Sequence, residues 1–364
     1  MDNLTDYLPD EIIGEIIKYI YSSKTIISLS STSKRFFDFF YSNNVYNKST
    51  EAKFILNTKE CIINKPLNFV TWLIISEDET SSFVPSMIDY FPNLLKLEHY
   101  SHNITPVIFI KDTPHDELFK NCNNLKELII DNYYNLLCNP FENMKNLINL
   151  KCTHCIISDS SCFTKLDKLE KLDISHTYTE YGFEFQNPNL KSLISTNSDN
   201  THTFLSKLHA LNELNINFSF FRNYTFSDNV NLETLCCARG DFYYNISDNI
   251  FYKLENLRYL DISFWKHLKN PLLYMSKLEV LVAINCVSLC DTAFDNVPLL
   301  KEVNISRCSS LVSPFKNIID LQRATMKDCP GLHELCISSM VLLYLDIIGS
   351  PHIKYHRGTK KIVR

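Results

Sequence analysis

The chain has 364 residues, of which 45% are hydrophobic, so it is long enough to bury a large core and longer than most compact globules. Its 36 basic and 41 acidic residues give a net charge of −5, a balance that argues against nucleic acid or an anionic membrane as the main partner. Glycine occurs only 6 times, which argues against glycine-rich phosphate-binding loops.

The beginning of the chain does not have the pattern of a secretory signal. Residues 1–6 are acidic, and no positively charged segment followed by an apolar one is present. Apolar runs elsewhere are interrupted before they reach a membrane-spanning length. We therefore expect a cytoplasmic protein, with the nucleus as the alternative compartment, that is not secreted. The 13 cysteines are then expected to be reduced, mostly in the core.

Two helices are predicted at the start of the chain. Residues 8–20 carry apolar side chains at helical spacing, and Pro9 suits the first turn of a helix. A second helical pattern covers residues 25–36, where Thr25 is a suitable N-terminal cap. Residues 46–65 are expected to form a linker or a capping helix.

Residues 4–45 resemble an F-box module. Leu8-Pro9-Asp10-Glu11 matches the family's L-P-x-E motif, and Ser33-Lys34-Arg35-Phe36 takes the place of its C-K-x-W motif, with Phe36 where the family has Trp. The resemblance implies a small all-α module that binds a Skp-type adaptor and, through it, a cullin. The alternative is a plain helical cap on the segment that follows. The apolar residues that would be divided between the module's core and the adaptor are Leu8, Pro9, Ile12, Ile16, Ile20, Ile27 and Leu29.

A repeated phrase, Asn-Leu-x-x-Leu-x-Ile, runs through most of the remaining chain. Its first Leu recurs at intervals of 21 or 22 residues, with one longer step between Leu232 and Leu257. A Phe stands six residues before that Leu in several repeats. The first-Leu positions are Leu125, Leu147, Leu169, Leu190, Leu211, Leu232, Leu257, Leu278, Leu300, Leu321 and Leu342. One repeat cannot bury its apolar residues alone, so we expect stacked repeats with a continuous core.

Residues 66–357 resemble the leucine-rich-repeat family, whose pattern is L-x-x-L-x-L-x-x-N/C. With the first Leu as position one, Cys155, Cys286, Cys308 and Cys329 occupy position nine. The resemblance implies an α/β solenoid of about 12–13 repeats, shaped as a horseshoe with a parallel β-sheet on its concave side. Repeats this short predict one- or two-turn helices or 3₁₀ segments on the convex side. Residues 358–364 are expected to form a basic tail.

No residue pattern indicates catalysis, a metal or a cofactor. Cys152 and Cys155 have a spacing found in zinc sites, but they occupy the repeat's own positions six and nine, and a second ligand pair is missing. The Gly-x-Ser-x-Gly elbow, the Walker loop and the dinucleotide fingerprint are all absent from the sequence. We therefore expect no catalytic residue, no metal site and no cofactor.

The concave face is the expected binding surface. Positions three, five and seven should point out of the sheet, and in one repeat all three are apolar, as is typical of a contact surface. Aromatic and Arg side chains lie near this row, and such residues dominate protein interfaces. The residues predicted to bind a target are Arg239, Tyr259, Asp261, Phe264, Trp265, Val280, Val282, Ile284, Asn285 and Arg307. The alternative is that Trp265 and the phenylalanines pack under the rim.

The two resemblances together predict a substrate-recognition subunit of a cullin/Skp-type ubiquitin ligase. Its F-box would dock on the adaptor, and its repeats would hold a target protein near the conjugating enzyme, which makes it a non-catalytic component. The main alternative is a repeat-based interaction scaffold or inhibitor whose N-terminal helices only cap the solenoid. An extracellular recognition protein is a third hypothesis, against which the missing signal pattern counts. Neither nucleic acid nor a membrane is expected as a partner.

Overall fold

The structure is a computed structural model that divides into two compact units, which we describe one at a time. The first unit contains residues 1–169 with 179–181, and the second contains residues 170–178 with 182–364. Within these units the structure describes residues 27–28, 53–57, 71–77, 91–101, 119, 122–131, 141–157, 160–179, 185–197, 205–219, 226–239, 246–333, 337–339, 341–353 and 359–363.

Six strands of the first unit pair in parallel and in chain order. Leu73 of β3 is in register with Leu97 of β4, and the row continues through Leu128 and Leu150. The second Leu of each repeat therefore forms one line across the sheet. The elements are β1 (Ile27–Ser28), β2 (Lys53–Asn57), β3 (Trp72–Glu77), β4 (Lys96–Ser101), β5 (Glu127–Asp131), β6 (Asn149–Thr153), β7 (Ile156–Ile157) and the 3₁₀ helix η4 (Ser160–Phe163).

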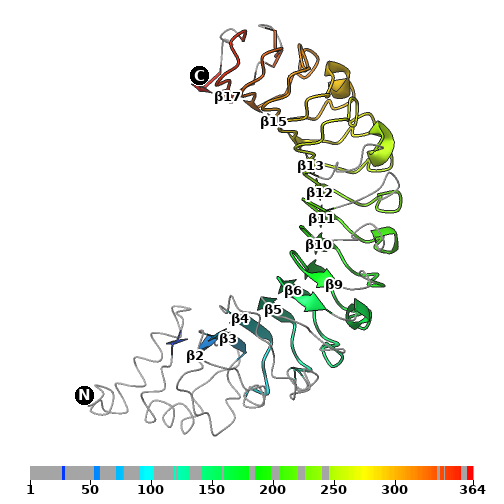
Figure 1. Cartoon of the computed structure of the whole chain (residues 1–364), viewed down its shortest axis with the longest axis vertical. Coiled ribbons are helices and arrows are strands. Elements are labelled where there is room, and N and C mark those ends of the chain that lie inside the picture. The colour runs from blue at the N-terminus through cyan, green and yellow to red at the C-terminus, as the bar shows by residue number, and fades with distance from the viewer. Residues whose placement is uncertain are drawn as a thin grey trace, which may run out of the picture. The chain divides into compact units, whose positions relative to one another are not determined.

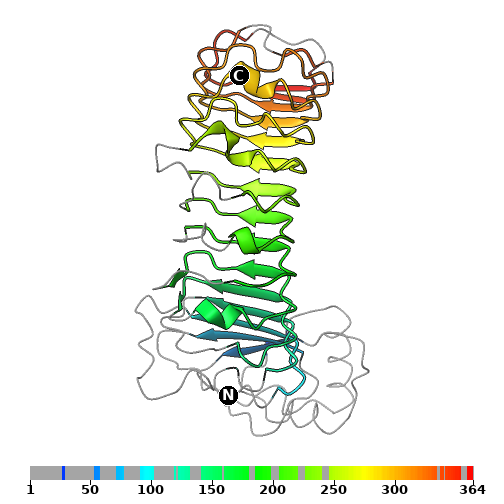
Figure 2. The ribbon, with the colours of Figure 1, turned by 90° about the vertical axis from the view of Figure 1, so that its right-hand side faces the viewer.

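The second unit is a stack of three-residue parallel strands, one per repeat, with their arrows in the same direction (Figure 2). Its strands line the inner side of the curved stack, and its turns lie on the outer side (Figure 1). The sheet strands are β8 (Lys171–Asp173), β10 (Ser192–Ile194), β11 (Glu213–Asn215), β12 (Thr234–Cys236), β13 (Tyr259–Asp261), β14 (Val280–Val282), β15 (Glu302–Asn304), β16 (Arg323–Thr325), β17 (Tyr344–Asp346) and β18 (Lys361–Val363). The remaining elements are η6 (Leu205–Lys207), η7 (Asp248–Phe251) and η8 (Asp291–Phe294), and the two residues of β9 (Tyr178–Thr179) are divided between the units.

The core is built from rows of equivalent side chains. In one repeat Leu257, Leu260 and Ile262 are fully buried, and Phe251 packs opposite them from the outer side. The N–H of Leu257 donates to the carbonyl of Leu254, and the N–H of Leu254 donates to the carbonyl of Phe251. Such i to i−3 turns place every third side chain on one face, so the Phe and the two following Leu residues all point inward. Phe226, which stands six residues before Leu232, stacks on Phe251 with 5.7 Å between ring centroids.

A left-handed residue ends the strand segment of the repeats that contain Leu147 to Leu342 as first Leu. Position eight of these repeats has a φ angle of 51° to 71°, although only one of these residues is glycine. In this conformation the N–H of Phe264 donates to the carbonyl of Ile284 in the next repeat, just as the N–H of Ile262 donates to Val282. The turn therefore extends the pairing between repeats beyond the three residues of the strand. The position-eight residues are His154, His176, Asn197, Phe218, Arg239, Phe264, Asn285, Arg307, Asp328 and Gly349.

The side chain at position nine ties neighbouring repeats of the second unit together. The Cys308 thiol donates to the carbonyl of Ala283, at position six of the preceding repeat, over 3.0 Å. Cys, Ser and Trp can each occupy position nine, because each side chain supplies one hydrogen-bond donor to a buried carbonyl. The donors of this ladder are Ser219, Trp265, Cys286, Cys308, Cys329 and Ser350. Three of the predicted position-nine cysteines therefore act as hydrogen-bond donors in the stack.

Alternating charges at position two form a second link between repeats. Glu279 accepts from Arg258 at 2.7 Å on one side and from Lys301 at 2.6 Å on the other. These two hydrogen bonds hold the pKa of the Glu279 carboxyl below its ordinary value. Glu170 and Lys191 repeat the arrangement at 3.1 Å. The row therefore stabilises the edge of the sheet at which the strands begin.

The structure differs from the predicted fold at both ends of the chain. Ile27, expected in the second N-terminal helix, lies in β1, which pairs with β2. Strand β2 in turn replaces the linker or capping helix at residues 53–57, and the other residues of the F-box-like segment lie outside the described part. In the predicted basic tail, β18 pairs with β17, because the last repeat otherwise leaves a row of unpaired backbone groups. Short 3₁₀ segments are confirmed, and the described residues contain no α-helix.

Replacing Cys308 by Ala should destabilise the protein by about 1–3 kcal/mol, because the buried carbonyl of Ala283 loses its donor. Cys308→Ser keeps a donor of the kind that Ser350 supplies at the same position, so it should retain most of the stability. The midpoint of urea unfolding measures both. Equal stability of the Ala variant and the wild type would contradict the ladder.

Glu279→Gln should lower the melting temperature near neutral pH by a small margin, because exposed ion pairs are screened by water. The lowered pKa of Glu279 means that its stabilising effect is present above the ordinary carboxyl pKa and is lost as pH falls through the folded-state pKa. The difference should therefore vanish in acid. Glu255→Gln is the matched control, since Glu255 is exposed and has no ion pair among the described residues. A difference that persists in acid would refute this explanation.

Candidate interaction surface

The candidate surface lies on the strand face of the second unit, over β11 to β15. Tyr259 of β13 is in register with Val280 of β14, and Asp261 is in register with Val282. All four side chains are half-buried, as is Ile284 just beyond β14. Because strand residues alternate in direction, these side chains share the face opposite the buried leucines. The predicted apolar row is therefore present and accessible.

Two polar residues near this row, Asp261 and Ser263, form hydrogen bonds that stabilise the turn after β13. The Asp261 carboxylate accepts the backbone N–H of Ser263 at 2.9 Å, so it supports the turn as well as facing outward. The Ser263 hydroxyl then accepts the N–H of Ile284 in the next repeat at 3.2 Å. Asp173 and Ser175 make the same local bond at 3.0 Å. Aspartate followed two residues later by serine is thus a structural feature of the repeat, which weakens the assignment of Asp261 to target binding.

Tyr259 and Cys236 on this face are held in their neutral forms. Burial raises the pKa of Tyr259, and the neighbouring Cys236 and Asp261 raise it further. Burial, with Asp261 next, raises the pKa of Cys236 to about 11. A protonated thiol is a poor nucleophile. The face is therefore suited to contact rather than to covalent chemistry.

Trp265 does not belong to the surface. Its side chain is fully buried, and its ring lies 5.8 Å from that of Phe251 in the core. The indole N–H donates to the carbonyl of Cys237 at 2.6 Å, which is the position-nine bond of this repeat. The prediction that Trp265 binds a target is therefore wrong, and the alternative, packing under the rim, is correct. Trp265 takes the place of the Asn or Cys in the repeat pattern.

The rim beside the strand ends carries the other predicted residues at position eight. Arg239 and Arg307 are exposed, whereas Phe264 and Asn285 are half-buried. Arg307 forms an ion pair with Asp328 at 3.5 Å. The structure brings Arg239, Phe264, Asn285 and Arg307 together along one edge of the strand face. Of the predicted adaptor-binding residues, only Ile27 is described, in β1, and the others lie outside the described residues.

A cation–aromatic stack on this rim was missed by the sequence reasoning. The Arg239 guanidinium lies over the ring of Phe264 at 4.5 Å and over that of Phe218 at 5.1 Å. Phe218 is 44% exposed and was not among the predicted binding residues. The available signal was the recurrence of aromatic and Arg residues at position eight of three consecutive repeats. This Phe218–Arg239–Phe264 stack is a candidate hot spot.

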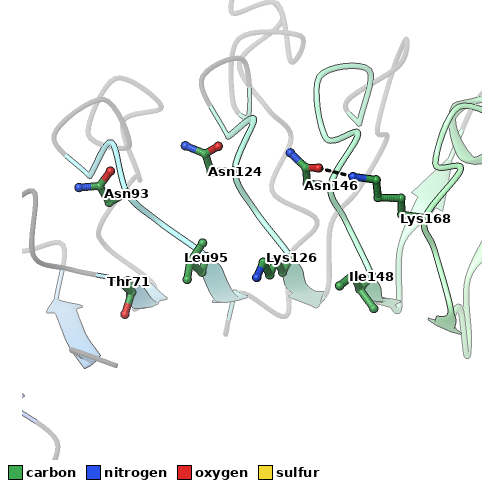
Figure 3. Close-up of a pocket in the computed structure, with 8 residues that line it drawn as sticks. All are labelled: Thr71, Asn93, Leu95, Asn124, Lys126, Asn146, Ile148 and Lys168. Carbon is green, nitrogen blue, oxygen red and sulfur yellow. Dashed lines mark hydrogen bonds between the residues drawn. The ribbon is translucent and has the colours of Figure 1, made fainter. Parts of the chain in front are cut away.

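The first unit contains a shallow groove of a different character (Figure 3). It has a volume of about 510 Å³ and lies where the strands begin. Its polar side chains bond to one another, as Lys168 donates to Asn146 at 2.8 Å and Asn146 to the carbonyl of Asn123 at 3.0 Å. These contacts link the repeats. The lining residues are Thr71, Asn93, Leu95, Asn124, Lys126, Asn146, Ile148 and Lys168.

The described residues include no group of three or more His, Cys, Asp or Glu side chains that could hold a metal ion. No helix in that part of the chain is long and apolar enough to cross a membrane.

Solved structures of other proteins are similar to this chain. An internalin from Listeria monocytogenes matches with a TM-score of 0.52 and 14% identity, over 96% of this chain and 90% of the internalin. A leucine-rich-repeat protein from Leptospira interrogans matches with a TM-score of 0.44 and 15% identity, over 78% of this chain and 85% of that one. No family model and no curated protein matches the sequence. The fold is that of a parallel leucine-rich-repeat solenoid, as the repeat pattern predicts.

Trp265→Phe should destabilise the protein by about 1–3 kcal/mol, because the carbonyl of Cys237 loses a buried donor while the aromatic packing largely remains. Thermal and urea unfolding measure the change. Because Trp265 is buried, partner binding below the melting temperature should stay as in the wild type. Unchanged stability together with reduced binding would contradict this account and indicate that Trp265 contacts the partner.

Proposed function

We propose that this chain is a non-catalytic interaction protein that binds a partner protein through the strand face of the second unit. The observation that carries the proposal is the accessible row of Tyr259, Val280, Val282 and Ile284 beside the Phe218–Arg239–Phe264 stack. Aromatic, aliphatic and Arg side chains are the types that contribute most of the energy at protein interfaces. A sheet of stacked repeats holds them in fixed positions, which limits the entropy lost on binding.

The row is unusual for a face in contact with water. On the adjacent strand β15 the corresponding positions carry the polar residues Glu302 and Asn304. Three apolar residues side by side on one repeat would gain by being covered, at about 25 cal/mol for each Å² removed from water. A partner that covers Val280, Val282 and Ile284 therefore supplies the favourable free energy that binding needs.

The more specific role that we propose is target recognition within a cullin/Skp-type ubiquitin ligase. Its support is the resemblance of residues 4–45 to an F-box, above all Leu8-Pro9-Asp10-Glu11, in a chain whose following repeats form an interaction solenoid. The N-terminal module would bind the adaptor, and the second unit would hold the target. The chain would then supply proximity between target and conjugating enzyme.

Replacing Leu8 and Pro9 together by Ala tests this role in the full-length chain. A truncation near residue 50 is less suitable, because it would remove β1 from the edge of β2. The double variant should lose capture of a purified Skp-type adaptor and keep its melting temperature. Ile319→Ala is the control, since Ile319 is a 66% exposed apolar residue far along the sequence, and it should retain capture. Failure of the folded wild-type chain to bind the adaptor would refute the ligase role.

The second candidate function is a scaffold or inhibitor in which the N-terminal segment only caps the repeats. The pairing of β1 with β2 favours it, because part of that segment continues the sheet as a cap does. It predicts the opposite result for the same variant. Replacing Leu8 and Pro9 would then lower the melting temperature and abolish no partner.

A further inference from the structure

The conformation of position eight is poorly suited to two of the residues that occupy it in the stack. Phe218 and Phe264 have φ angles of 62° and 71°, a region that bulky side chains avoid and that glycine and Asn tolerate. Asn285 and Gly349 show that this fold accepts such tolerant residues at the same place. Residues held in strained conformations concentrate at functional sites. The two phenylalanines are therefore better explained by what their rings do than by the needs of the turn.

The two rings fix the Arg239 side chain from both sides. The guanidinium carbon lies 5.1 Å from the Phe218 ring centroid and 4.5 Å from the Phe264 centroid. The backbone N–H of each of the three residues bonds to a carbonyl of the next repeat, at 2.7 to 2.8 Å, so their spacing is set by the solenoid. Contact of this kind with ring faces leaves the planar set of N–H donors available for hydrogen bonds. The side chain is exposed.

Arg239 also differs from the other arginines that the structure describes. Arg258, Arg307 and Arg323 each lie within ion-pair distance of a carboxylate. Arg239 makes no such ion pair with any described residue. An exposed guanidinium matches the geometry of a carboxylate, which it binds through two parallel hydrogen bonds. Stacking on the aromatic rings reduces the rotamer entropy that such binding would otherwise cost.

We propose that the Phe218–Arg239–Phe264 stack receives an acidic side chain of a partner protein, whose neighbouring apolar residues lie on Val282 and Ile284. This inference rests on the proposed interaction function and adds the chemistry of the partner. A carboxylate fits better than a nucleic-acid backbone. The net charge of the chain is −5, Asp261 lies on β13 beside Phe264 and Glu302 lies on β15, so a polyanion would meet repulsion around Arg239.

The test is a selection of random displayed peptides on the full-length chain, followed by affinity measurements with the enriched peptides. They should carry Asp or Glu next to an aliphatic or aromatic residue, and changing that acid to its amide should weaken binding about tenfold or more. Arg239→Gln should cause a similar loss. Arg239→Lys should also weaken binding, because Lys keeps the charge without the planar pair of donors. Arg323→Gln, which changes a paired arginine, should leave the affinity within about twofold.

Each other outcome contradicts the proposal. Enriched peptides without an acidic residue would show that the stack does not bind a carboxylate. Peptides that bind Arg239→Gln as tightly as the wild type would show the same. Arg239-dependent binding of a mixed-sequence single-stranded oligonucleotide, with no acidic peptide selected, would assign the stack to phosphate. Peptides that are lost with Val282→Asp and unaffected by Arg239→Gln would leave the interaction function intact and refute the acidic anchor. A folded chain that selects no peptide would count against both.

Discussion

The hydrogen bonds between neighbouring repeats are the constraint on which the rest of the structure depends. A strand of three residues supplies few of them, so the pairing must continue into the turn that follows. The left-handed residue at position eight makes this continuation, with an N–H such as that of Asn285 donating to Ser306 in the next repeat. Position nine then closes the turn from inside, through a donor such as the thiol of Cys329. The repeat length follows, since each turn must return to the same register.

The same constraint creates the candidate binding surface. Once strand and turn are fixed, equivalent positions of successive repeats lie side by side in rows. Residues distant in sequence, such as Phe218, Arg239 and Phe264, become adjacent because each occupies position eight. The backbone carries the cost of holding a bulky residue at positive φ, about 1–2 kcal/mol each, and the core of the solenoid offsets it. A flexible loop would not hold an arginine between two rings in this way.

The rows of buried side chains were predictable from the sequence, because the apolar residues recur at the length of one repeat. Leu260 and Phe251 are buried where the pattern places them. The candidate surface was only partly predictable. In a repeat pattern with Asn or Cys at position nine, Trp265 was predicted to lie on the surface. Its indole N–H instead donates the buried hydrogen bond that Asn or Cys makes at that position. The stack around Arg239 depends on a positive φ angle that its Phe and Arg residues do not indicate, and Ile27 pairs in a sheet where helical spacing predicted a helix.

Hydrogen exchange resolved to single amides tests most directly whether the turns hold the stack together. The bonds from position eight predict that the amides of Arg239, Phe264 and Asn285 exchange as slowly as the strand amides of Leu260 and Leu281, although the Arg239 side chain is exposed. Exchange of these three amides at the rate of an unprotected loop, with protection confined to the three-residue strands, would contradict the account.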